Sequence, residues 1–201
     1  MTLKILISRY VERKALKDPW SGPINIGSPI NTINDEFYPA LADNGNLYFT
    51  VDKKELARKD DIYVSVFSDG KYNAPKVLSE NINSTGYEFN AFISPDESYI
   101  LYTCYNRKDG LGSGDLYMSY RTETDWTPAQ NIGALVNTEK MEYCPFVDVK
   151  KNILYFTSKR DNTKTVFSKP LAIDALKNQF FQYENGLSRL YKVALDSILK
   201  K

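Results

Sequence analysis

The chain of 201 residues contains no histidine and only two cysteines, Cys104 and Cys144. Without an imidazole the sequence offers no Ser-His-Asp or Cys-His catalytic arrangement and no histidine-ligated zinc site. The two cysteines occupy different positions within their repeats, so we predict two unpaired, packed thiols and no disulfide framework. No metal site and no cofactor are expected from these residues.

The chain also lacks a long apolar run and an excess of either charge. No stretch approaches the length that spans a bilayer, and Ile5-Leu6-Ile7 is too short for the core of a signal peptide. The 26 lysines and arginines against 25 acidic residues leave a net charge of +1. Nucleic-acid binding needs a concentrated basic surface, so we expect neither a nucleic-acid partner nor a transmembrane segment.

What the chain does contain is a pattern that occurs three times at a spacing of 52 to 54 residues. Each copy has an aromatic residue shortly before a proline, then an asparagine, a glutamate and an apolar triplet. The aromatic residues are Trp20, Tyr72 and Trp126, the asparagines Asn31, Asn83 and Asn137, the glutamates Glu36, Glu88 and Glu142, and the triplets Leu47-Tyr48-Phe49, Ile100-Leu101-Tyr102 and Leu154-Tyr155-Phe156. A repeat of this length is typical of a supersecondary unit that buries its faces by stacking against copies of itself.

Within each unit the residues predict short strands. In the first unit these are 36–41, 46–51, 61–67 and 74–78, separated by turn residues. Four strands per unit of about fifty residues favour a propeller blade over a sandwich. We therefore predict an all-β fold, a β-propeller of four-stranded antiparallel blades, with about three to four blades present. The single domain, 1–201, divides into a partial blade (1–27), blades at 28–79, 80–135 and 136–193, an insertion at 158–188 and a C-terminal tail at 194–201.

These units resemble the TolB-like, or WD-like, β-propeller repeats of bacterial envelope proteins. The residues that carry the resemblance are those at 20–27 and 126–133, Asp35-Glu36, Ser94-Pro95-Asp96, Asp61-Ile62-Tyr63 and Asp115-Leu116-Tyr117. The resemblance implies a periplasmic or exported protein whose partner is another protein or an envelope polymer. It also implies structural positions that recur in each repeat, namely Trp20, Tyr72, Trp126, Asp61, Asp115, Tyr63, Tyr117 and Tyr191.

The third unit departs from the pattern. Arg189 stands where the other units have an aspartate before the third strand, and the insertion at 158–188 precedes it. Leu171, Ala175, Leu176 and Phe180 recur there at helical spacing, which predicts a short helix packed on the propeller rim. The tail at 194–201 is expected to form a second short helix, with lysines near its C-terminus where they suit the helix dipole.

The strand count predicts an incomplete ring. Residues 5–10 align with a third strand and 23–26 with a fourth, so the chain offers half a blade, two whole blades and three strands of another. Closed propellers usually have four to eight blades. Unpaired strand edges promote association. We therefore expect either further blades upstream in a longer protein, which is the simpler explanation, or closure of the ring by self-association.

The repeated glutamates and asparagines are the candidate ligand-facing residues, because equivalent positions would lie near the inner strands and the channel. Paired carboxylates in different environments could hydrolyse a glycoside. One glutamate per blade is also what a repeated structural hydrogen bond produces. We favour this structural interpretation for Glu36, Glu88 and Glu142. We also favour it for Asn31, Asn83 and Asn137, because asparagine readily satisfies the backbone of turns.

Residues 109–115 form the one glycine-rich run. A phosphate-binding loop needs a helix directly after it, whereas a strand is predicted from Asp115. Calcium-binding nonapeptides occur as consecutive arrays, and this run occurs once. We therefore predict a tight connection between two strands.

With no catalytic constellation in view, we expect a non-enzymatic binding or scaffold propeller that presents its loops or channel to a protein or cell-envelope partner. The alternative is a carbohydrate-active enzyme or sugar-binding lectin that uses the carboxylates near the channel. As a structural test of the repeat, we expect Leu47, Leu101 and Leu154 to occupy equivalent positions between blades.

Overall fold

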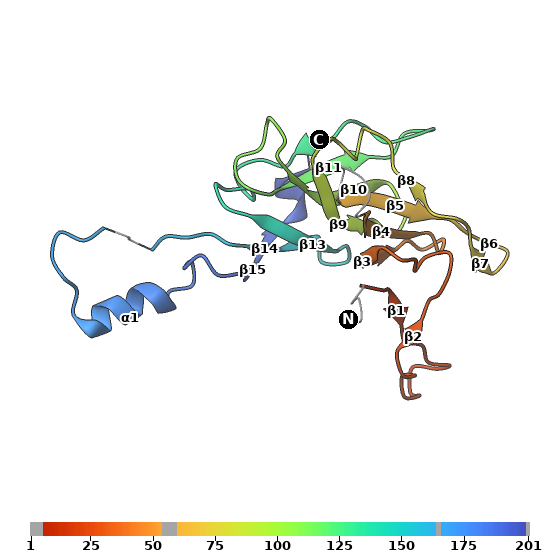
Figure 1. Ribbon diagram of the computed structural model, residues 1–201, viewed down its shortest axis with the longest axis horizontal. Coiled ribbons are helices and arrows are strands. Elements are labelled where there is room, and N and C mark those ends of the chain that lie inside the picture. The colour runs from red at the N-terminus through yellow and green to blue at the C-terminus, as the bar shows by residue number, and fades with distance from the viewer. Residues whose placement is uncertain (1–5, 54–59, 164–165, 200–201) are drawn as a thin grey trace.

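The computed structural model describes residues 6–53, 60–163 and 166–199. The fold is all-β, with antiparallel sheets of two to four strands and one short helix (Figure 1). Among the described residues, no helix has the length and apolar character needed to cross a bilayer.

Three larger sheets follow one another along the chain and share one strand order. The first sheet comprises β3 (Asp35–Leu41), β4 (Leu47–Asp52), β5 (Asp60–Ser65) and β8 (Lys76–Val77), with a hairpin of β6 (Phe67–Ser68) and β7 (Lys71–Tyr72) beside it. The second comprises β9 (Tyr87–Ile93), β10 (Tyr99–Tyr105), β11 (Asp115–Tyr120) and β12 (Gln130–Asn131). The third comprises β13 (Glu142–Asp148), β14 (Ile153–Ser158) and β15 (Arg189–Ala194). The strands predicted for the first two units are confirmed, each within a few residues.

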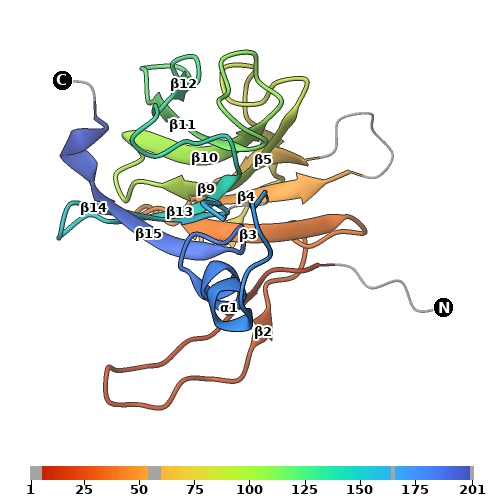
Figure 2. The same ribbon diagram turned by 90° about the vertical axis from the view of Figure 1, so that its left-hand side faces the viewer.

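A small N-terminal pair precedes these sheets. It consists of β1 (Arg9–Tyr10) and β2 (Ile24–Asn25). The strand predicted at 5–10 is thus two residues long where it is described, and its first residue lies outside the described part. Figure 2 shows the N-terminal pair on one side of the first sheet and the second sheet on the other.

Two hydrophobic clusters join the three large sheets. Tyr48 of β4 packs with Ile93, Ile100 and Tyr102 of the second sheet. In the next cluster, Leu101 of β10 packs with Val147, Leu154 and Phe156 of the third sheet. Successive side chains of a strand point to opposite faces, so the second sheet buries one face against the first sheet and the other against the third.

The expected equivalence of Leu47, Leu101 and Leu154 is wrong by one residue. Glu36, Glu88 and Glu142 pair with Val51, Cys104 and Ser158 on the second strands, which makes Ile100 the counterpart of Leu47 and Leu154. Leu101 corresponds to Tyr48 and faces the following sheet instead. A shift of one position reverses the face of a strand residue.

The first strand of each sheet, β3, β9 or β13, is interrupted by a bulge two residues after its glutamate. The pairing register with the second strand shifts at this point in all three sheets. The bulge residues Tyr38, Asn90 and Cys144 have φ angles of 52°, 54° and 53°. Non-glycine residues rarely adopt this left-handed conformation, so the bulge is a built feature of the repeat.

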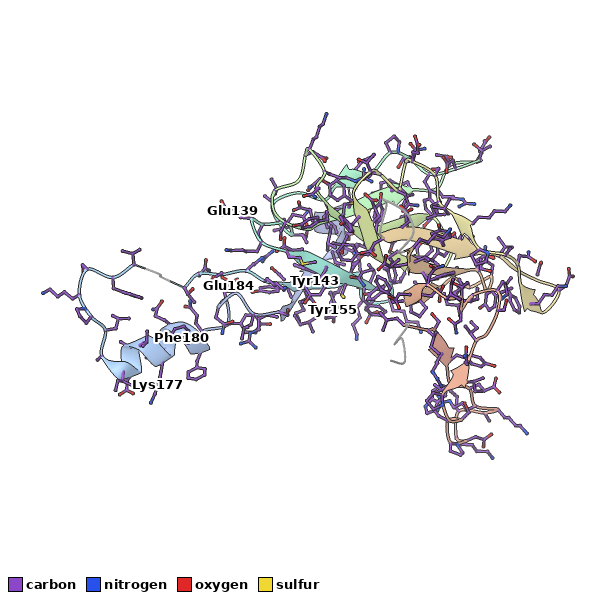
Figure 3. The ribbon with its side chains drawn as sticks, viewed as in Figure 1. Glu139, Tyr143, Tyr155, Lys177, Phe180 and Glu184 are labelled. Carbon is purple, nitrogen blue, oxygen red and sulfur yellow. The ribbon has the colours of Figure 1, made fainter. Side chains whose placement is uncertain are left out.

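The helix α1 (Ile173–Phe181) is present but does not pack on a rim. None of its residues is buried, and Ile173 and Phe180 are 72 % and 63 % exposed. Figure 3 shows Lys177 and Phe180 of this helix well away from Tyr143 and Tyr155 of the third sheet. Its apolar spacing therefore predicted the helix correctly, whereas the expected packing is wrong.

The tail forms a single 3-10 turn, Leu195–Ser197, in place of the expected α-helix. Leu195 is buried in the cluster between the second and third sheets, and Ile198 and Leu199 pack against it. These apolar contacts hold the tail on the sheets. Its last two residues lie outside the described part.

Candidate functional site

Each of the three repeated glutamates closes the turn that precedes its own strand. Their exposed fractions are 1 % for Glu36 and 0 % for Glu88 and Glu142. In each case Oε2 accepts the backbone N–H of the residue four positions earlier, and Oε1 accepts that residue's hydroxyl. The N–H donors are Thr32 at 3.0 Å, Ser84 at 2.9 Å and Thr138 at 2.8 Å. The two bonds in each turn fix the start of the strand that follows.

An arginine joins this arrangement in the second and third sheets. Arg107 lies 3.2 Å from Oε1 of Glu88, and its Nη2 also donates to the carbonyl oxygen of Ile82 at 2.5 Å. Arg160 lies 3.9 Å from Oε1 of Glu142. A buried charge is stable only when it is paired and hydrogen-bonded, and both conditions hold here.

The same arginines stack on the third-strand tyrosines, which the resemblance had marked as structural. The Arg107 guanidinium carbon is 5.3 Å from the ring centre of Tyr117, and that of Arg160 is 4.7 Å from the ring centre of Tyr191. In the first sheet the ammonium group of Lys53 lies 4.9 Å from the ring centre of Tyr63. A cation over an aromatic ring adds electrostatic attraction. Arg107 and Arg160 thereby connect the glutamate of the first strand to the tyrosine of the third.

The three asparagines act as clamps on the preceding sheet. Asn83 accepts the N–H of Ile62 at 2.8 Å and donates to the carbonyl oxygens of Ile62 and Leu78, both at 3.0 Å. Its amide thus continues the sheet beyond β8 as a backbone would. Asn137 holds Leu116 in the same way, at 2.8 and 2.9 Å, and Asn31 holds Ser8, at 2.8 Å for both bonds.

Five of these six residues are buried in the structure. The three glutamates are buried, as are Asn83 and Asn137 at 1 % exposure each, while Asn31 is half-buried. Their polar atoms are engaged in bonds that repeat from sheet to sheet. Hydrolysis by a carboxylate pair requires two accessible groups in different environments, and this geometry provides neither.

Asp115 organises the glycine-rich run, which connects β10 to β11 as predicted. Its Oδ2 accepts the N–H groups of Leu111 at 2.9 Å and Gly112 at 3.2 Å. A Cβ on Gly112 would lie 2.2 Å from the carbonyl oxygen of Lys140, so this position has no room for a side chain. Asp115 is 2 % exposed, and burial raises the pKa of its carboxyl. Asp61, its counterpart in the first sheet, is also buried.

The repeated aromatic residues before proline do not share one environment. Trp126 is 2 % exposed and packs edge-on against Tyr48, with ring centres 6.4 Å apart. Tyr72 is half-buried beside Phe67, 5.1 Å away. Trp20, expected to be an equivalent structural position, is 57 % exposed and lies under Arg13. The expectation for Trp20 is therefore wrong, because no counterpart of Tyr48 lies beside it in the described residues.

The sequence reasoning missed the residues at the bulges. The hydroxyl of Tyr38 donates to the carbonyl oxygen of Pro145 at 3.2 Å and lies beside the Cys144 thiol. Burial is the main cause that raises the pKa of the Tyr38 hydroxyl. The first and third sheets thus meet at their first strands. No local pattern marks this contact, since a left-handed residue within a strand has no sequence signature when it is not glycine.

Both cysteines are free, Cys104 buried and Cys144 half-buried, which confirms the predicted unpaired thiols. Among the residues described, no group of three or more cysteine or acidic side chains is placed to hold a metal ion. The chain was compared with models of known protein families and with curated protein sequences, and neither comparison gave a match.

Proposed function

We propose that this chain folds as a TolB-like β-propeller in which the three large sheets are successive blades and the N-terminal pair is the outer half of another blade. The proposal is supported by the repeated strand order and by the asparagine clamp, which links every one of these units to the next. The first strands β3, β9 and β13 contact one another, as strands around a common axis do.

We further propose a non-enzymatic role, in which the chain presents its loops or channel to a protein or an envelope polymer. One observation carries this proposal: the carboxylates that a glycosidase would use are buried and bonded alike in all three sheets. A periplasmic or exported location follows from the resemblance to envelope propellers and is part of the same proposal.

The experiment compares polymer binding with polymer cleavage on the full chain. Purified envelope polymers, including peptidoglycan, are incubated with the chain, and co-sedimentation and released reducing ends are measured in parallel. We expect no release above background for the chain or for Glu142→Gln. Product release that disappears in a folded Glu142→Gln variant would overturn the non-enzymatic role and favour the carbohydrate-active alternative.

A further inference from the structure

An apolar groove of about 830 Å³ lies between the N-terminal pair and the first sheet. Its lining includes Tyr10, Pro39, Leu41, Leu47, Phe67 and Tyr72. A third hydrophobic cluster, with Leu47 and Phe49 buried and Tyr72 packed against them, fills only part of the space on this face of the first sheet. A comparison of this groove with the filled spaces on either side of the second sheet shows which element would cover its apolar surface.

Leu47 at the base of the groove is buried, whereas two other residues of the lining are exposed although their counterparts in the two filled spaces are buried. Leu41 is 61 % exposed, whereas its counterparts Ile93 and Val147 are 2 % exposed each. Tyr10 is 44 % exposed, whereas Met118 at the same position of the second sheet is 2 % exposed. The apolar surface of the groove is thus the surface of an interface with one component missing.

The filled spaces identify that component as a second strand. Tyr48 of β4 pairs with Val64 and fills the space before the second sheet. Leu101 of β10 pairs with Met118 and fills the space before the third. The corresponding residue beside β1 would pair with Tyr10 and point into the groove, because residues directly opposite in an antiparallel pair share a face.

The backbone of β1 is oriented to receive such a strand. Ser8 directs its N–H and carbonyl toward the β2 side, where Asn31 and Ile26 bind them. Alternation along the strand turns the N–H groups of Arg9 and Val11 to the opposite edge. No strand in the described part of the chain pairs with that edge.

We infer that the groove and the free edge of β1 together bind an extended polypeptide segment that adds to β1 as an antiparallel strand and inserts a leucine or aromatic side chain opposite Tyr10. In strand addition, main-chain bonds give affinity and a side-chain pocket gives specificity. Arg9 and Lys71 line the groove and are exposed, so a segment without net positive charge is favoured. This assignment deepens the binding role proposed for the chain and rests on it.

The probe is a fluorescent peptide with the sequence of residues 45–53, which carries the natural second-strand side chains Leu47, Tyr48 and Phe49. We expect saturable binding to the full chain by fluorescence anisotropy, and slower hydrogen exchange of the Arg9 and Val11 amides when the peptide is bound. A peptide with Tyr48→Ser should bind more weakly by at least about tenfold, because the pocket then receives no apolar side chain.

Two variants of the chain locate the site. Leu41→Lys should weaken peptide binding by at least about tenfold, because it places a charge in the groove. Leu190→Lys is the matched control, because Leu190 is 64 % exposed on β15, and it should bind as the parent does. Val11→Pro removes the N–H that the added strand would use, and Val11→Ala retains it. Leu41 and Val11 are both exposed, so their substitution should leave the fold intact, and circular dichroism of each variant checks this.

Several results would overturn the inference. One is no binding at the highest soluble concentration of peptide. Another is binding that Leu41→Lys and Val11→Pro leave unchanged. A third is a dimer in sedimentation that Leu41→Lys dissociates, because the groove would then hold a second copy. Glycan cleavage by the chain would overturn the proposed non-enzymatic role but would leave peptide binding intact, so the two failures are distinguishable.

Discussion

The hydroxyl of Tyr38 donates to the carbonyl oxygen of Pro145 over a sequence separation of 107 residues. Tyr38 lies at the bulge of β3, and Pro145 follows the bulge residue of β13. The two strands begin the first and third sheets, and β9 of the second sheet contacts both. The three first strands thus lie near one another, as strands arranged around a common axis would, and the bond between β3 and β13 is made at their bulges.

Loss of this hydroxyl should weaken the link between the sheets. Tyr38→Phe is expected to lower the free energy of unfolding by about 0.5–1.5 kcal/mol, the usual net value of one hydrogen bond. Urea denaturation measures the change. Tyr10→Phe, at a tyrosine on exposed β1, is the control and should be near neutral. An equal effect of the two substitutions would mean that the Tyr38 contact does not hold the sheets.

The asparagine clamp occurs at a buried site, Asn83, and at a half-buried site, Asn31, so the effect of burial on the same bonds can be compared. Asn83→Ala should cost about 2–3 kcal/mol, because the buried N–H of Ile62 loses its partner and the Ile62 carbonyl keeps only the N–H of Leu78. Asn31→Ala removes the same pair of bonds to Ser8 at a half-buried site where water can replace them, and should cost about 1 kcal/mol. Chemical denaturation of both variants tests whether Asn83→Ala loses more stability than Asn31→Ala. Asparagines that served only to bind a ligand would not produce this difference.

The buried glutamates should matter for stability. Glu88→Gln is expected to cost about 1–3 kcal/mol, since the substitution leaves Arg107 without its charged partner. Glu80→Gln, at an exposed glutamate of the same loop, should be neutral. Thermal unfolding of the two variants measures both changes in stability. Unchanged stability of Glu88→Gln would contradict the structural role of the repeated carboxylate.

Asp115 should make stability depend on pH. Burial raises the pKa of its carboxyl above the ordinary value of 3.8. The folded state therefore binds the proton more tightly than the unfolded chain, so this contribution to stability is present below the unfolded pKa and is lost as pH rises through the folded one. Asp115→Asn has no such charge to bury.

The difference in unfolding free energy between Asp115→Asn and the parent should thus shift in favour of the variant as the pH rises above about 4, the ordinary pKa of an aspartate. Urea denaturation at a series of pH values measures it. A difference that does not change with pH would show that the carboxyl titrates alike in both states.

The sequence was sufficient to predict what depends on local pattern and repetition. Short runs of apolar and β-branched residues between turn residues predicted β3 to β5 and β9 to β11, and the nearly equal spacing of Glu36, Glu88 and Glu142 predicted a shared structural bond. Contacts between distant segments were not predictable in this way. The exposure of Trp20 depends on the absence of a neighbouring strand, and the face of Leu101 depends on a register that its apolar neighbours Ile100 and Tyr102 leave ambiguous.

The helix α1 shows the same limit. Its spacing of apolar residues specifies a helix but not a surface to cover it, and the structure leaves Ile173 and Phe180 exposed. The left-handed bulges at Tyr38, Asn90 and Cys144 arise from the meeting of three strands, a tertiary constraint that no single strand sequence contains.

The rotation between successive sheets tests the propeller arrangement most directly, and a crystal structure of residues 1–201 measures it. We expect the second sheet to be related to the first, and the third to the second, by rotations of about 45° to 90° in the same sense about one axis, the range for rings of four to eight blades. The Tyr38 hydroxyl should face Pro145 near that axis. Sheets stacked face to face with strands aligned within about 30°, as in a sandwich, would contradict the arrangement and the function proposed from it.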